Sequence, residues 1–159
     1  MTQKTVARWL KGIIIGVALC GLIIFGLVVP AIGHAIAGAN PEFSYCYLPW
    51  LIFICLCALP CYAALVLGWK IAADIGHDRA FTTENAKRLK YITVLAVADA
   101  MFFFTGNVVF LLLNMNHPGI ALLSLIVVFA GITIAIAAAA LSYLVKKAAA
   151  LQEQSDLTI

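Results

Sequence analysis

Four long apolar runs constrain this chain more than any other feature of its sequence. They cover residues 12–37, 47–69, 91–113 and 119–145, and Asp99 is the one formally charged residue inside them. A helix needs about 20 residues to cross a hydrocarbon core of ~30 Å, and each run is long enough. Only helices and closed barrels satisfy their own backbone inside a bilayer, and these runs lack the alternating polarity of barrel strands. We therefore predict an all-α polytopic membrane protein, a four-transmembrane-helix bundle that forms one membrane domain over residues 1–159.

The composition agrees with a membrane protein. Hydrophobic residues make up 65% of the chain and charged residues 11%, whereas soluble domains carry about 25% charged residues. The basic start of the chain, followed by an apolar run, also resembles a secretory signal. The run is longer than the roughly 7–15 apolar residues of a signal, however, so we expect an uncleaved first span.

The positions of the basic residues predict the orientation of the spans. Every Lys and Arg lies before the first run, in the connection 70–90 or in the tail 146–159. The other two connections have none, and the first of them contains Glu42. Because cytoplasmic loops carry an excess of Lys and Arg, we expect both termini and the connection 70–90 to lie in the cytoplasm.

Two short segments suggest a family. The sequence Phe81-Thr82-Thr83-Glu84-Asn85-Ala86-Lys87-Arg88-Leu89-Lys90 and the ending at residues 151–159 resemble DUF2975, an uncharacterised bacterial family of four-span membrane proteins. Members typically have a proline where this chain has Ala80, which puts an identical use of this surface in doubt. The resemblance implies a place in the bacterial cytoplasmic membrane. It also implies a role in sensing or regulation, because genes of the family often sit beside those of small helix-turn-helix regulators.

Asp99 is the main candidate for chemistry within a span. An ionised carboxylate near mid-membrane costs at least ~2.5–3.5 kcal/mol, so we expect this group to be neutral, paired or beside a hydrated cavity. On a helical wheel Asn107 and Asn114 fall close to Asp99, and Tyr62 lies at a similar depth in the second span. We predict a hydrogen bond from Tyr62 to Asp99. The polar site would be either a proton or cation relay, or a neutral contact between helices.

The sequence offers little for enzymatic chemistry. Cys57 and Cys61 lie on one helix face, but a zinc site needs about four converging ligands, and packing is the more frequent role of cysteines in a span. No phosphate-binding loop, nucleophile elbow or zinc-protease motif is present. We expect neither an enzyme nor a bound metal or cofactor.

Two functions remain open. The first is a non-enzymatic membrane sensor or regulator that presents its cytoplasmic loop and tail to a soluble partner, such as a helix-turn-helix regulator. Lys87 and Arg88 on the loop, with Glu153 and Asp156 on the tail, would bind that partner or pair with one another. The alternative is a small oligomeric transporter or channel that uses Asp99. Beyond the lipid bilayer, we expect a regulatory protein or a second copy of the chain as partners, and no direct contact with nucleic acid.

Overall fold

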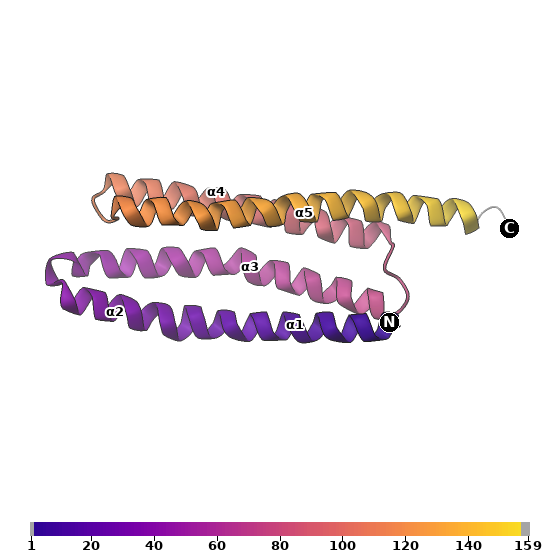
Figure 1. The fold of residues 1–159 in the computed structure, drawn as a ribbon, viewed down its shortest axis with the longest axis horizontal. Helices are drawn as coiled ribbons and strands as arrows, with labels where there is room; N and C mark the ends of the chain where they lie inside the picture. The colour runs from indigo at the N-terminus through magenta and orange to yellow at the C-terminus, as the bar shows by residue number, and fades with distance from the viewer. Residues whose placement is uncertain (1, 157–159) are drawn as a thin grey trace.

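The structure, a computed structural model, describes residues 2–156, and within them it consists of helices and short connections (Figure 1). The elements in chain order are α1 (Gln3–Ile23), the π-helical turn η1 (Ile24–Val28), α2 (Val29–Ala39), the 3-10 helix η2 (Pro41–Cys46), α3 (Tyr47–Gly76), α4 (Thr83–Leu112) and α5 (Pro118–Asp156). The first three form one continuous rod. Pro30 has no N–H to offer the carbonyl of Gly26, and the wider π turn that precedes it accommodates the missing bond.

Four helical segments are long and apolar enough to cross a membrane, as the sequence predicts. They are Gln3–Ala39, Pro41–Gly76, Thr83–Leu112 and Pro118–Ser155. Large apolar side chains cover their outer surfaces, and Leu112 and Phe129, for example, are 77% and 72% exposed. Such a surface is stable in lipid and not in water. The prediction of an all-α protein with four membrane-spanning helices is confirmed.

The helices extend beyond the predicted spans at the end that carries the Lys and Arg residues, here called the basic end. The expected loop 70–90 is mostly helical, because α3 continues to Gly76 and α4 begins at Thr83. The predicted tail is also helical as far as Asp156, since α5 runs through Lys146 and Lys147 to that residue. Residues 148–153 are alanine, leucine, glutamine and glutamate, all good helix formers, so nothing stops the helix there.

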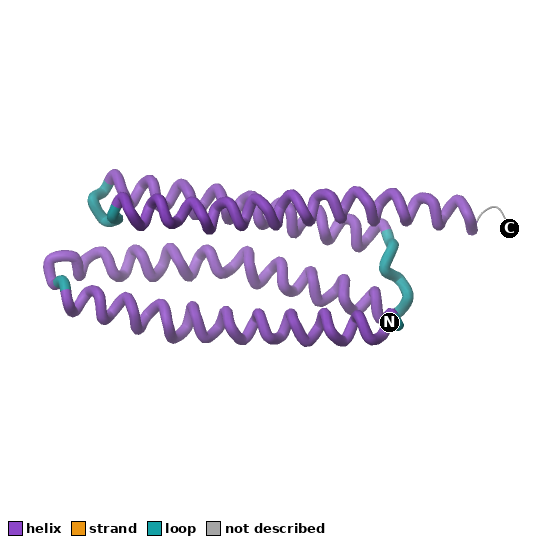
Figure 2. Tube along the Cα trace, viewed as in Figure 1, coloured by secondary structure: helices purple, strands orange, loops and turns teal. Residues whose placement is uncertain are grey.

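The helices pack in chain order and leave the bundle open. The rod of α1 and α2 lies along α3, α3 along α4, and α4 along α5, whereas the backbone of α5 nowhere approaches α1, α2 or α3 within the described residues. Figure 1 shows the result as two antiparallel helix pairs joined by the α3–α4 connection. Figure 2 shows that this connection lies at the same end as both chain ends, opposite the two tighter turns.

Glycines on α1, α2 and α4 allow α3 to approach its neighbours closely. The ring of Tyr47 covers Gly33, and the hydroxyl end of Tyr62 covers Gly21. On its other side α3 places the ring of Phe53 directly against Gly106 of α4. Phe53 is buried and lies in a cluster of aromatic rings with Trp50, Phe102, Phe103 and Phe110. These contacts set the register between the helices.

Candidate functional site

Asp99 lies on the side of α4 that faces α3, as expected for a polar group within a span. The thiol of Cys61 donates a hydrogen bond to its Oδ2 atom, with a sulfur–oxygen distance of 3.7 Å. Its Oδ1 atom is buried and has no hydrogen-bond partner among the described residues. A thiol is a weak donor, so the carboxyl group is poorly satisfied.

The predicted hydrogen bond from Tyr62 to Asp99 is wrong. The Tyr62 hydroxyl instead donates to the backbone carbonyl of Ala18 in α1, at 2.9 Å. That contact is possible because Gly21 leaves room for the phenol on the surface of α1. Tyr62 therefore ties α3 to α1, on the side of α3 that faces away from Asp99's helix.

The other two residues of the predicted polar site, Asn107 and Asn114, also make separate contacts. Asn107 is buried, and its side-chain amide donates to the carbonyl of Phe103 at 2.9 Å. Its own Oδ1 accepts from Asn116, at 3.2 Å, in the turn between α4 and α5. Asn114 is exposed in that turn with a φ of 56°, a left-handed conformation that asparagine tolerates. Asp99, Tyr62, Asn107 and Asn114 thus do not form one site, and Asn116 is a partner that the helical wheel could not reveal.

A dense polar network joins α3 to α4 at the basic end. Arg88 donates to Asp74 at 2.6 Å and to the side-chain oxygen of Asn85 at 2.9 Å. Arg79 adds a longer contact with Asp74, at 3.3 Å. The Asp74 and Arg88 side chains are only 18% and 19% exposed, so their pairing is shielded from water to a large extent.

Asn85 is the centre of this network, which we call the Asn85 node (Asp74, Arg79, Asn85 and Arg88). Its side chain is 1% exposed and donates to the carbonyls of Arg79 and Ala80, at 3.0 and 3.2 Å. Its backbone N–H donates to the hydroxyl of Thr82, the N-cap residue of α4. Asn85 therefore closes the α3–α4 connection through its side chain and joins the N-cap of α4 through its backbone.

Arg88 does not pair with the tail, which was one of the two predicted roles of its charge. Arg88 is used within the Asn85 node and also lies 3.8 Å from Glu84. Lys87 and Glu153 are exposed on α4 and α5, and the side chain of Asp156 lies outside the described residues. Of the four residues proposed to bind a partner, Lys87 and Glu153 are thus available, and Arg88 is better described as structural.

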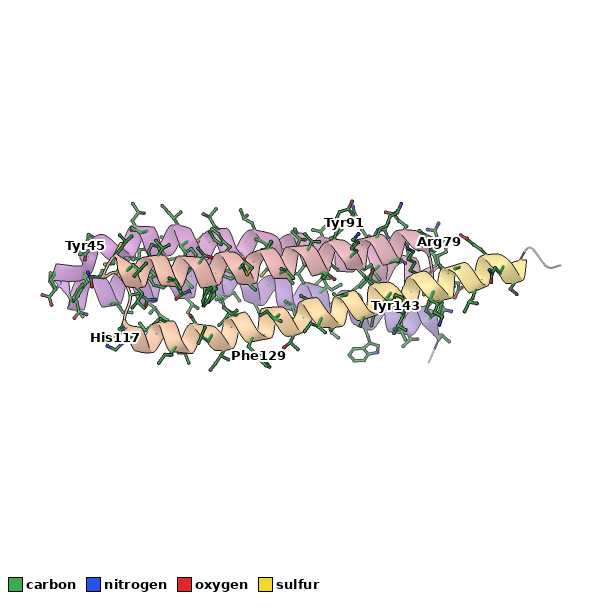
Figure 3. All side chains as sticks on the ribbon, turned by 90° about the horizontal axis from the view of Figure 1, so that it is seen from above. Tyr45, Arg79, Tyr91, His117, Phe129 and Tyr143 are labelled. Carbon is green, nitrogen blue, oxygen red and sulfur yellow. The ribbon has the colours of Figure 1, made fainter. Side chains whose placement is uncertain are left out.

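A cavity of about 800 Å³ lies at the opposite end, between α2, α3 and the turn that joins α4 to α5. Figure 3 shows Tyr45 and His117 at this end and Arg79 at the other. The walls are apolar, and the rim carries asparagines and His117. A smaller cleft of about 320 Å³ lies at the basic end, where Lys4, Arg8 and Lys11 face the end of α3. Asp99 lines neither of these two cavities.

Comparison with known proteins agrees with the resemblance seen in the sequence. The family model described as "Protein of unknown function (DUF2975)" matches residues 31–159. The chain belongs to the DUF2975 family. It is also 32% identical over 149 residues to the "Uncharacterized membrane protein YoaS" of Bacillus subtilis (strain 168), with 92% of each chain covered. No solved structure matches.

The segment 81–90, one of the two that carry the resemblance to DUF2975, supplies Asn85 and Arg88 to the Asn85 node. Thr82 caps α4, Asn85 holds the preceding carbonyls and Arg88 reaches Asp74 of α3. The sequence indicates the helix start, because a Thr and an acidic residue precede a helical run. It carries no comparable signal for Asp74, whose position depends on how α3 packs against α4.

Proposed function

We propose that this DUF2975 protein is a non-enzymatic sensor or regulator of the bacterial cytoplasmic membrane, with its basic end in the cytoplasm. The placement of every Lys and Arg at that end supports this orientation. The soluble partner, such as a helix-turn-helix regulator, would bind exposed parts of α4 and α5 there.

The observation that carries the proposal is the projection of α5 beyond the rest of the molecule at the basic end (Figure 1). Ser142 donates to the carbonyl of Ala86 at 2.7 Å, which aligns this part of α5 with the first turns of α4. From that point α5 continues to Asp156, whereas α4 begins only three residues earlier, at Thr83. At 1.5 Å per residue, α5 thus extends ~16 Å past the start of α4.

The exposed charges on and beside this projection suit a protein partner. Lys87 and Lys90 lie on the first turns of α4, and Lys146, Lys147 and Glu153 lie on α5. The surface carries both signs, which favours a specific protein contact over binding to a uniformly charged polymer.

The transporter alternative needs a hydrated path to Asp99. Neither the cavity at the opposite end nor the cleft at the basic end is lined by Asp99. The carboxyl instead meets the Cys61 thiol between α3 and α4. These observations favour the sensor over the transporter.

The proposal is tested by truncation. A chain that stops after Ala149 keeps the buried Ala149 and loses the projecting turns. We expect it to insert in the membrane and melt as the full-length protein does, and to lose its interaction with a helix-turn-helix regulator in a two-hybrid assay. Glu42→Ala, at the opposite end, is the matched control and keeps the interaction. If truncation changes neither the interaction nor any phenotype of the intact protein, the proposed regulatory surface is wrong.

A further inference from the structure

The cavity between α2, α3 and the α4–α5 turn is large enough to hold a ligand. Its volume of about 800 Å³ falls within the roughly 300–1,000 Å³ of small-molecule sites. Its walls are mainly apolar, with Val29, Ile32 and Ile36 from α2, Leu51 and Ile54 from α3, and the aromatic rings of Phe43, Tyr47 and Trp50. Water in such a space would lack hydrogen-bond partners, so an apolar chain is the natural occupant.

The rim of the cavity is polar but uncharged. Asn40, Asn114, Asn116 and His117 supply amide and imidazole groups that can donate and accept hydrogen bonds. The Oδ1 atom of Asn116 is buried and has no partner among the described residues. Such a group is stabilised by a ligand that brings a hydrogen-bond donor, such as a hydroxyl.

The charge distribution selects against an anionic headgroup. Every Lys and Arg of the chain lies toward the basic end, whereas the connection at this end contains Glu42. A phosphate at the rim would therefore find no Lys or Arg among the lining residues to balance its charge. A headgroup of hydroxyls does not meet this problem.

The site is largely preformed. The Trp50 indole N–H donates to the carbonyl of Met115 at 2.7 Å and holds the α4–α5 turn over α3. The Tyr47 ring rests on Gly33 and lies 4.4 Å from the His34 ring, which fixes α2 against α3. The two sides of the cavity are thus held apart by α3, since the backbone of α2 does not approach α4 or α5 within the described residues.

We propose that this cavity binds a membrane lipid with an uncharged, hydroxyl-bearing headgroup, of the diacylglycerol or glycosyl-diacylglycerol class. The acyl chain lies between α2 and the α4–α5 turn, and the hydroxyls meet the asparagines of the rim. This lipid is the input of the sensor, and to that extent the inference rests on the proposed function. The second copy of the chain, as another possible occupant, is an outcome of the test below.

Trp50 provides a direct probe of the cavity. It is one of three tryptophans, and the other two, Trp9 and Trp69, lie toward the basic end. The full-length chain with Trp9→Phe and Trp69→Phe is placed singly in phosphatidylcholine nanodiscs. Its fluorescence is titrated with doxyl-labelled diacylglycerol and, separately, with doxyl-labelled phosphatidylglycerol.

We expect saturable quenching by the diacylglycerol probe, with about tenfold lower affinity for the phosphatidylglycerol probe, the change that ~1.4 kcal/mol produces. Ala37→Phe places a ring in the cavity and should abolish the saturable phase. Ala35→Phe adds the same ring on the same helix at a position that does not line the cavity, and should leave it intact.

Three results would overturn the inference. Quenching that rises linearly and is the same in both phenylalanine variants means that the probe meets Trp50 only from bulk lipid. Equal or tighter binding of the phosphatidylglycerol probe rules out a preference for an uncharged headgroup. Loss of binding in nanodiscs that hold two copies, together with a stable dimer, assigns the cavity to a second chain. None of these measurements involves the cytoplasmic partner, so a failure here is distinct from a failure of the truncation test.

Discussion

Arg88 donates a hydrogen bond of 2.6 Å to Asp74 across the connection between α3 and α4, and both side chains are about four-fifths shielded from water. This pair joins the two helix pairs of the molecule at the point where only residues 77–82 connect them. Because α3 and α4 are the only helices of the two halves whose backbones approach one another in the described part of the chain, the pair contributes to the relative position of the halves.

Asp74→Asn should therefore destabilise the protein. The substitution keeps the shape of the side chain and leaves the partly buried Arg88 without its anion, which we expect to cost roughly 1–3 kcal/mol. The measurement is thermal unfolding in detergent micelles. Arg79→Gln is the control, because the Arg79 side chain is 66% exposed and its contact with Asp74 is longer, at 3.3 Å. It should cost less than ~1 kcal/mol.

A double-mutant cycle separates the pair from its surroundings. Asp74→Asn combined with Arg88→Met should cost less than the sum of the two single changes, since each removes the same interaction. Additive effects would mean that Asp74 and Arg88 stabilise the protein through separate contacts.

Asn85→Asp should open the α3–α4 connection. The change replaces an amide that donates to the carbonyls of Arg79 and Ala80 with an oxygen that cannot donate when ionised. We expect a loss of roughly 1–3 kcal/mol and faster cleavage of residues 77–82 in limited proteolysis. Lys87→Ala, on the same helix but exposed, is the control and should leave the cleavage rate unchanged. A rate for Asn85→Asp that matches wild type would show that the buried amide does not hold the connection.

Gly106→Ala should disturb the contact between α3 and α4. A Cβ at this position would overlap the ring of Phe53, which is itself held among other aromatic rings. We expect a cost of about 1–3 kcal/mol from the forced movement. Gly16→Ala in α1 meets nothing within 4 Å. It should be neutral or stabilise the helix by up to ~1 kcal/mol. Thermal unfolding of both variants in one detergent gives the comparison, and equal melting temperatures would contradict the proposed packing of Phe53.

Asp99→Asn tests the transporter alternative. The carboxyl has one weak donor, Cys61, and a buried oxygen without a partner in the described residues. Replacing this carboxyl group with an amide, which cannot ionise, should therefore leave the melting temperature unchanged or raise it. Proteoliposomes should show the same background proton flux with the wild type, the variant and no protein. A flux that requires the wild-type carboxyl would favour the transporter and contradict the sensor.

The spans and the family were predictable from the sequence because they depend on local features. Long apolar runs, one-sided Lys and Arg residues and the segment that contains Thr82 and Asn85 are visible without knowing any contact. The helix ends were less predictable. Thr82 and Glu84 indicate the start of α4 ahead of its apolar run, whereas the continuation of α3 to Gly76 and of α5 to Asp156 was not predicted.

The polar contacts could not be predicted, because they depend on which helix faces which. Depth alone placed Tyr62 near Asp99, but α3 directs that phenol toward Ala18 of α1 and directs Cys61 toward Asp99. These adjacent residues differ by ~100° on the helix, which is enough to send them to different neighbours. The cavity at the opposite end depends in the same way on packing, since its two sides come from α2 and from the α4–α5 turn.

Trp50→Phe should loosen the α4–α5 turn while keeping the ring that packs on α3. The change removes the hydrogen bond of 2.7 Å to the carbonyl of Met115, and we expect a cost of about 0.5–1.5 kcal/mol. Because that bond links α3 to the turn, the backbone amides of residues 113–117 should exchange faster with deuterium, while those of the Asn85 node stay protected. Trp9→Phe, at a side chain that is 66% exposed, is the control and should change neither region. Unchanged exchange in the turn of Trp50→Phe would mean that Asn107 and Asn116, joined at 3.2 Å, hold the turn without help from the indole.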